Sequence, residues 1–202
     1  MKRILILVIS LVAPLMASAQ TRGQFGLNAG YCLGWYIENQ NTNSGFSLGL
    51  DYYFPGLEDH TNGIFAGVAF PGGSGTPVNM SLGMMWTGRN WQESITPVFG
   101  VGLDLRTNWA DTYDYNSADV NASLHEITNG RDGLGGGLIL RAGIAWPKHI
   151  SLFANFSAGR YATYQDVYKL DIKNDGWDYS GFETQKTART YVTASINFGF
   201  RF

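Results

Sequence analysis

A histidine and a serine two residues apart are side chains whose types could do chemistry together. His149 and Ser151 flank Ile150, and an imidazole beside a serine hydroxyl can take its proton and make the oxygen a nucleophile for ester cleavage. No carboxylate that could orient the histidine is nearby in the sequence, and the pair follows closely on Pro147. The pattern favours a short capped turn over a catalytic site, so we expect no enzyme activity from it.

A second candidate is a run of oxygen-bearing side chains that could bind calcium. Asp171, Lys173 and Asp175 stand at alternate positions before Gly176, as ligands stand before the turn glycine of a calcium loop. However, Lys173 occupies a ligand position, and Phe182 stands where such a loop places a glutamate. The segment is therefore predicted to be a polar surface loop that binds no metal or other cofactor.

Charged residues inside otherwise apolar segments form the third candidate group. Five of them alternate with bulky apolar residues: Asp51, Asp104, Arg106, Arg141 and Arg189. A charge enclosed in a narrow, poorly hydrated space must find an opposite charge, because an unpaired buried charge is costly. We predict a network that links Asp51 and Asp104 with Arg106, Arg141 or Arg189, provided that the surrounding elements bring them into one interior.

Those elements are predicted to be β-strands, because bulky and small residues alternate with a period of two. The last segment shows this most clearly, since Val192, Ala194, Ile196, Phe198 and Phe200 alternate with polar or small residues. Segments of this kind cover residues 24–33, 46–54, 64–70, 78–86, 95–106, 134–146, 150–157 and 189–202. The sequence thus predicts about eight strands.

The volume of an eight-stranded barrel decides which face of these strands points inward. Its interior is only just wide enough for side chains to fill it, so it cannot hold the large side chains of all eight bulky faces. The small and polar faces must line the interior, and the bulky faces must then contact lipid. We predict an all-β fold, a closed antiparallel up-and-down transmembrane β-barrel of about eight strands, rather than a soluble barrel.

The amino terminus predicts export. Two basic residues and an apolar run over residues 4–12 precede Ala17-Ser18-Ala19, which has the pattern of a cleavage site. Residues 1–19 are therefore expected to be a signal peptide and residues 20–202 the barrel domain, because the apolar run is too short to span a bilayer as a helix. The single cysteine, Cys32, can form no internal disulfide bond, so burial and backbone pairing must hold the fold.

Composition narrows the class of partner. The two basic residues of the leader leave with it, so 12 of the 14 basic residues remain against 16 acidic ones, a net charge of about −4 that disfavours nucleic acid as a partner. The chain has 26 Gly, 12 Phe, 11 Tyr and 6 Trp, but no further apolar stretch of the roughly 20 residues that a transmembrane helix needs. Strands must therefore account for the aromatic residues and the glycines.

The predicted connections alternate between long and short. Residues 107–133 and 161–187 form the longest loops, on one side of the barrel, whereas the turn 147–149 on the other side is minimal. Outer-membrane barrels have such long loops outside the cell and short turns in the periplasm, where both chain ends also lie. Aromatic residues near strand ends, Trp35 and Tyr161 among them, are expected to form interfacial girdles.

The last strand carries a family resemblance. Residues 195–202 place Phe198, Phe200 and Phe202 at alternate positions and resemble the carboxy-terminal assembly signal of outer-membrane barrels. In strand number and loop asymmetry, residues 23–202 resemble the small OmpA/OmpX-like class of eight-stranded bacterial outer-membrane proteins. The resemblance implies recognition by the barrel assembly machinery, a place in the outer membrane of a Gram-negative cell, and contact with outer-membrane lipid and lipopolysaccharide.

Three classes of function stay open for such a barrel. The first is a structural or surface-interaction role, because the loops 107–133 and 161–187 carry aromatic side chains among acidic groups, which suits the binding of an extracellular protein or glycan. These aromatic residues are Trp109, Tyr113, Tyr115, Tyr164, Tyr168, Trp177 and Tyr179. A small, porin-like pore is the second, because many inward glycines would leave room for water. A lipid-modifying enzyme of the outer membrane is the third.

Overall fold

The strands of the chain close into a ring. A computed structural model describes residues 24–37, 41–54, 61–72, 77–87, 94–108, 113–115, 124–147, 149–173 and 176–202. The strands are β1 (Gln24–Tyr36), β2 (Asn41–Tyr53), β3 (Thr61–Phe70), β4 (Pro77–Thr87), β5 (Thr96–Asn108), β6 (Tyr113–Tyr115), β7 (Leu124–Ala145), β8 (Ile150–Lys173) and β9 (Gly176–Arg201). None of the described residues forms a helix long and apolar enough to cross a membrane.

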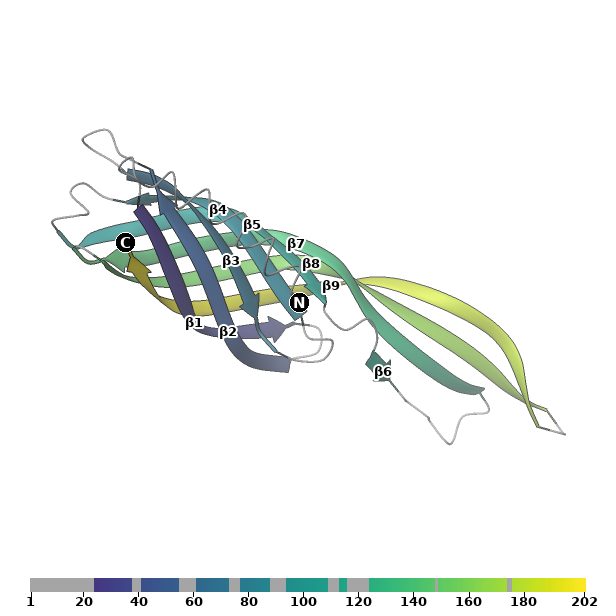
Figure 1. Cartoon of the computed structure of the whole chain (residues 1–202). Coiled ribbons are helices and arrows are strands. Elements are labelled where there is room, and N and C mark those ends of the chain that lie inside the picture. Colours follow the sequence, from purple (N-terminus) through teal and green to yellow (C-terminus); the bar gives the residue numbers. More distant parts are fainter. Residues whose placement is uncertain are drawn as a thin grey trace, which may run out of the picture.

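Antiparallel pairing joins each strand of the ring to its sequence neighbours. β1 to β5 pair in order, β5 then pairs with β7, β7 with β8 and β8 with β9, and β9 returns to β1 (Figure 1). The short strand β6 stands outside the ring and pairs only with β7. Eight strands therefore form a closed up-and-down barrel, and the predicted fold class is confirmed.

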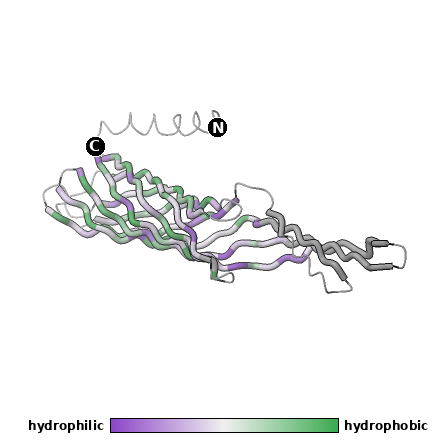
Figure 2. The backbone as a smooth tube through the Cα atoms, turned by 90° about the horizontal axis from the view of Figure 1, so that it is seen from below, coloured by the Kyte–Doolittle hydropathy of each residue, from purple (hydrophilic) through white to green (hydrophobic). Residues whose placement is uncertain are grey.

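The bulky face of each strand points outward, as the volume of the barrel requires. In β5, Leu103 is 69% exposed while the next residue, Asp104, is 4% exposed; in β9, Ile196 is 65% exposed and Asn197 is 2% exposed. Apolar and hydrophilic residues alternate along the strands of the barrel wall (Figure 2). An outer wall of exposed Leu, Ile and Phe side chains has to be covered by lipid.

The seam between the first and last strands is closed by backbone hydrogen bonds at the chain end. The Phe202 amide donates to the Phe25 carbonyl at 2.9 Å, and the Phe25 amide donates to the Phe202 carbonyl at 3.2 Å. Farther along, a Cβ atom at Gly30 would lie 1.9 Å from the Ile196 carbonyl oxygen, so only glycine permits this approach of β1 to β9. Phe198, Phe200 and Phe202 all lie exposed on the outer wall.

The prediction that residues 107–133 and 161–187 form long loops is wrong wherever these residues are described; residues 109–112, 116–123 and 174–175 lie outside the described residues. β5 continues to Asn108, β7 begins at Leu124, and β8 and β9 continue as far as Lys173 and Gly176. Outside the ring both faces of a strand meet the same surroundings, so bulky and small residues need not alternate there. The period-two pattern that predicted the other strands is therefore weak in these segments.

Three strands extend beyond the ring and form a projecting sheet, which we call the arm. The arm consists of residues 124–131 of β7, 163–173 of β8 and 176–188 of β9, with β6 at the edge of β7. β7, β8 and β9 have 22, 24 and 26 residues, whereas β1 to β5 have between 10 and 13. Figure 1 shows β7, β8 and β9 leaving the barrel together. A register shift between Asp132 and Gly135 of β7 lies next to the first residues of the arm.

The outward position of Leu103 gives a direct test of the lipid-facing wall. The substitution Leu103→Arg should lower the free energy of unfolding by about 2–4 kcal/mol, because it places a charge in the apolar band. Gln185→Arg, at an exposed position in the arm, should change it by less than about 0.5 kcal/mol. Both values come from denaturant titration in phosphatidylcholine vesicles, and equal effects would contradict the assignment of the band.

Candidate functional site in the barrel interior

Large side chains fill the barrel at the end that holds the carboxy terminus. Tyr53, Phe65, Met85, Val98 and Phe153 all occupy inward positions, have no exposed surface and belong to one apolar cluster. They come from five different strands, β2, β3, β4, β5 and β8. This apolar layer packs across the described barrel at that end.

Inward glycines make room for these aromatic rings. A Cβ atom at Gly83 would lie 2.5 Å from Cζ of Phe65, and one at Gly143 would lie 2.7 Å from Cδ1 of Phe153. The same holds higher in the barrel, where a Cβ atom at Gly159 would lie 2.7 Å from the Tyr191 hydroxyl oxygen. The space beside these glycines, which suggested a water-filled channel, is therefore occupied by side chains from neighbouring strands.

A buried ion pair lies on the inner side of the apolar layer. Arg141 Nη1 donates to Asp51 Oδ1, and both side chains are about 98% buried. Arg141 Nε donates to Asn155 Oδ1 at 2.8 Å, and Asn28 Nδ2 donates to Asp51 Oδ2 at 2.9 Å. The guanidinium carbon lies 4.1 Å from the centre of the Phe65 ring, which adds a cation–π contact. Hydrogen-bonding partners on both sides offset part of the cost of burying this pair.

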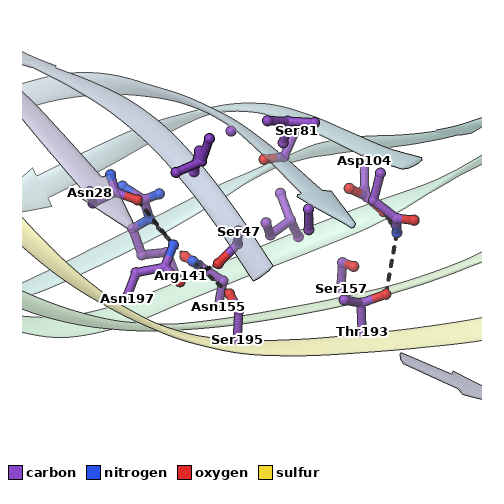
Figure 3. A pocket seen from close by; sticks show the side chains of 16 residues that line it. Asn28, Ser47, Ser81, Asp104, Arg141, Asn155, Ser157, Thr193, Ser195 and Asn197 are labelled. Atoms are coloured by element: carbon purple, nitrogen blue, oxygen red, sulfur yellow. Dashed lines mark hydrogen bonds between the residues drawn. The ribbon is translucent and has the colours of Figure 1, made fainter. Parts of the chain in front are cut away.

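Amide side chains extend the pair into a polar layer across the barrel. Asn197 Nδ2 donates to Asn28 Oδ1 at 3.0 Å, and the Ser47 hydroxyl donates to Asn197 Oδ1 at 2.6 Å. Asn155 Nδ2 donates to the Ser195 hydroxyl oxygen at 3.1 Å. Figure 3 shows these side chains converging from β1, β2, β7, β8 and β9. The layer joins strands that are far apart in the ring.

A second carboxylate lies nearer the arm and binds neutral groups. Asp104 Oδ2 accepts hydrogen bonds from Asn79 Nδ2 at 2.9 Å and from the Tyr191 hydroxyl at 2.8 Å. Asn79 Nδ2 also lies 3.3 Å from Thr193 Oγ1, and Ser157 lines the same space (Figure 3). Asp104 is thus held by an amide and a phenol.

Arg106 caps the interior at the arm end of the barrel. Its guanidinium carbon lies 4.4 Å from the centre of the Tyr161 ring and 5.3 Å from that of Tyr191. Its Nη2 lies 4.0 Å from Asp132 Oδ2, and Asp132 also accepts a 3.5 Å hydrogen bond from Thr163. Tyr161 was expected in an outer aromatic girdle but is 3% exposed and faces inward. Arg106 and the two tyrosine rings thus pack across part of the lumen at this end.

Between the two ends lies a small polar cavity of about 30 Å³. Its walls include Asn28, Ser47, Asn79, Arg141 and Thr193. Such a volume holds roughly two water molecules, since each needs about 10–15 Å³. Within the described residues, the interior is a packed polar core that contains this small cavity.

The structure brings together some of the five charged residues and separates others. Arg141 and Asp51 are in contact, whereas Asp104 and Arg106 lie in the next layer and reach different partners. Arg189 does not join the network: it lies one inward position beyond Tyr191, is half-buried, and forms no ion pair with a described residue. The alternation along β9 predicts correctly that Arg189 lies on the inward face. However, β1 pairs with β9 only as far as Tyr191, so β1 does not flank β9 at Arg189.

Arg201 is a buried cation that the network prediction missed. It is 1% exposed, and its Nη2 donates to the Trp146 carbonyl and, at 3.3 Å, to the Ile150 carbonyl. Its guanidinium carbon also lies 5.5 Å from the centre of the Tyr53 ring. Alternation does place Arg201 inward. Its position next to the chain end gave no reason to expect burial, because terminal residues are commonly solvated.

The histidine and the serine of the candidate ester-cleaving pair are not joined by a hydrogen bond. His149 Nδ1 lies 2.7 Å from the Arg201 carbonyl oxygen, and its ring stacks on Phe200 at 5.3 Å between centroids. Ser151 is buried in the interior, and its hydroxyl has no hydrogen-bond partner among the described residues. The two side chains therefore lie in different surroundings.

The other sequence candidates lie in or near the arm. Asp171 and Lys173 belong to β8 and Gly176 begins β9, so a hairpin replaces the predicted polar loop; Asp175 lies outside the described residues. Of the loop aromatics, Trp109 also lies outside them, Tyr113 and Tyr115 belong to β6, Tyr164 and Tyr168 to β8, and Trp177 and Tyr179 to β9. The aromatic residues that are described thus lie on strands.

The closed ring, the filled interior and the apolar wall together define a class of protein. The chain is a small transmembrane β-barrel, and single-chain barrels of this architecture are proteins of bacterial outer membranes. The outer membrane is therefore its location. No family model matches the sequence, and no curated protein matches it.

Solved structures similar to this chain include bacterial outer-membrane proteins. OprG from Pseudomonas aeruginosa is 14% identical, with a TM-score of 0.46 over 89% of this chain and 96% of that chain. Neisserial surface protein A is 13% identical, with a TM-score of 0.44 over 89% and 95% of the two chains. The N-terminal β-barrel domain of Pseudomonas aeruginosa OprF is 12% identical, with a TM-score of 0.42 over 90% and 100%. The class assignment itself rests on the ring and its apolar wall.

The ion pair between Arg141 and Asp51 can be tested with a double-mutant cycle. Arg141→Met alone should cost about 3–5 kcal/mol of unfolding free energy, because it leaves the Asp51 carboxylate buried and unpaired. Asp51→Asn in the same chain should restore part of that loss. Arg189→Met, which removes a half-buried cation without a described acidic partner, should cost under about 1 kcal/mol. Additive effects of the two pair substitutions would show that the charges do not interact.

Proposed function

We propose that this protein is a sealed outer-membrane barrel that holds the arm outside the cell as a binding surface for an extracellular protein or glycan. The observation that carries the proposal is the length of β7, β8 and β9, which have 22, 24 and 26 residues. A tilted strand crosses a bilayer in about 9–11 residues, so the additional length is not needed to span the membrane.

The arm is long enough to reach well beyond the lipid. Residues 163–173 of β8 alone span roughly 35 Å at about 3.3 Å per residue. β9 has one edge that pairs with β8 and another that pairs with β1 in the ring. Along this second edge, residues 176–189 pair with no strand of the described chain, because β1 pairs only with later residues of β9. An open strand edge can add a strand from a partner, and Tyr and Trp residues, which β8 and β9 carry, are common in interfaces.

The interior supports a sealed barrel rather than a pore. The apolar layer fills one end and Arg106 packs against tyrosine rings at the other, with the buried ion pair between them. The pore is therefore the second candidate function. We further propose that the barrel has no catalytic role, which the separation of His149 from Ser151 supports.

A sealed interior predicts the electrical behaviour of the protein. The unaltered protein should show little steady current in planar-bilayer recordings, because a cavity for roughly two waters cannot pass hydrated ions. Arg106→Ala should admit more frequent brief openings by removing the cap. A stable, ion-selective open channel in the unaltered protein would reject the sealed barrel and favour the pore.

The sidedness of the arm is the decisive test of the surface role. Trypsin added to intact cells should cut at Lys169, Lys173 or Arg131, because the arm carries these residues. Lys148, between β7 and β8, should be spared. The same treatment of lysed cells is the control, in which Lys148 should also become accessible. Cleavage at Lys148 in intact cells, with the arm protected, would place the arm in the periplasm and reject the proposed function.

A further inference from the structure

β7 has a break in its pairing where it leaves the ring and enters the arm. On the side facing β8, Gly133 and Leu134 lie opposite the single residue Ala162. On the other side, pairing with β5 stops before residues 131–134 and pairing with β6 starts beyond them, so these residues pair with no strand of the described chain there. A bulge of this kind interrupts the hydrogen-bonded ladder and bends a strand. β7 therefore has a point of weakness at the base of the arm.

The surrounding strands allow the arm to bend at this height. β8 and β9 continue past residues 131–134 of β7 paired with each other, while β9 has no pairing with β1 beyond Tyr191. A sheet of few strands bends more readily than a closed barrel, because closure fixes the tilt and stagger of the strands. Next to the bulge, Gly136 is exposed, and a Cβ atom there would meet only the Asp104 carbonyl oxygen, at 3.8 Å. Among the described residues, the outer side of β7 is therefore open at this point.

One buried cation touches every strand that enters the arm from the ring. The guanidinium group of Arg106 contacts Asp132 of β7, Tyr161 of β8 and Tyr191 of β9. Arg106 itself belongs to β5, which ends at Asn108 and takes no part in the arm, and it is only 1% exposed. The three strands of the arm are thus held at their exit by one side chain from a strand that stays in the ring.

The contact with Asp132 is the one that depends directly on the bend of β7. Asp132 immediately precedes the bulge, and its Oδ2 lies 4.0 Å from Arg106 Nη2. A hydrogen-bonded ion pair has a separation of about 2.7–2.9 Å, so a movement of roughly 1 Å in either direction completes this contact or breaks it. The attraction between the two charges is only weakly screened, because both side chains are shielded from water. A bend at residues 131–134 is therefore transmitted to a buried cation.

We propose that Arg106 is a latch that couples the arm to the lumen, so that a bend of the arm at residues 131–134 loosens the outer end of the lumen. When β7 bends, Asp132 moves away from the guanidinium group, and a buried cation that loses a carboxylate is drawn toward water. Arg106 then leaves its place against the Tyr161 and Tyr191 rings. The coupling is reciprocal, because one set of contacts serves both the arm and the lumen. That a bound partner bends the arm rests on the proposed function, but the latch itself does not.

Removal of the latch should free the arm and the lumen together. Arg106→Met keeps most of the side-chain volume but removes the charge. In the protein in lipid vesicles, amide hydrogen exchange of residues 163–172 should become about tenfold faster, as the loss of one charged contact predicts. Brief openings in planar bilayers should become more frequent by about the same factor. Asp132→Asn should change both quantities only about threefold, because the amide oxygen still accepts a hydrogen bond.

A substitution outside the lumen tests the coupling in the opposite direction. Gly136→Ala fits the open outer side of β7 and restricts the backbone next to the bulge. In the Asp132→Asn background, where openings are frequent enough to count, it should slow the exchange of residues 163–172 about threefold and make openings rarer by a similar factor. Its methyl group points away from the lumen, so its effect can reach the lumen only through β7. Slower exchange with unchanged openings would overturn the latch.

Two controls separate the latch from a general loss of stability. Residues 42–53 of β2 pair only with β1 and β3, away from the arm, and their exchange should stay within about twofold in every variant. Arg189→Met removes an inward, half-buried cation from β9 at the base of the arm and should change neither exchange nor openings. Equally faster exchange in β2, or more openings in Arg106→Met without faster exchange in the arm, would overturn the proposal. The trypsin experiment on cells tests the sidedness of the arm separately, so a failure of the proposed function is distinguishable.

Discussion

The narrow interior of an eight-stranded barrel is the constraint on which the rest of this structure depends. The lumen holds little more than one layer of side chains, so each large inward residue needs a small one beside it. Phe65 packs where Gly83 has no side chain, and Tyr191 packs against Gly159. The same limit sends Leu103 and the other bulky residues outward into lipid. An apolar exterior and a filled interior are thus two results of one geometric limit.

The ion pair in the middle of this small space is surrounded by hydrogen-bond partners. Arg141 has Asp51 and Asn155 as hydrogen-bond partners and the Phe65 ring against its guanidinium plane, so little of its polar surface is left unmet. A buried pair of this kind contributes little net stability compared with apolar packing, because desolvation opposes the attraction. It does join β2 to β7 across the barrel. A register slip of one residue would turn either group into lipid, so the pair disfavours misregistered strands.

The alternation of bulky and small residues predicted the ring because lipid lies on one side of each strand and the packed lumen on the other. That contrast ends at about Tyr161 and Thr190, and the sequence signal ends with it, although backbone pairing continues to Lys173 and Gly176. The sequence pattern therefore did not predict the arm. The alternation predicted correctly which side chains point inward, but it did not predict which of them are in contact. Asp104 binds Tyr191 and Asn79 instead of an arginine. Arg189 lies on the inward face of β9 but beyond the last residue of β9 that pairs with β1. Alternation carries no information on which strands face each other across the lumen.

Continuity of β8 and β9 ties the arm to the barrel. Both strands pass from the lipid band into the arm without a break in their mutual pairing near Tyr161 and Arg189, so the base of the arm takes its direction from the ring. Arg106 lies at this junction, between the Tyr161 ring and Asp132, next to the register shift that ends at Gly135. The packing around Arg106 therefore also fixes the arm at its base. A barrel sealed as we propose would offer partners only its outer surfaces, which are the lipid-facing wall and the arm.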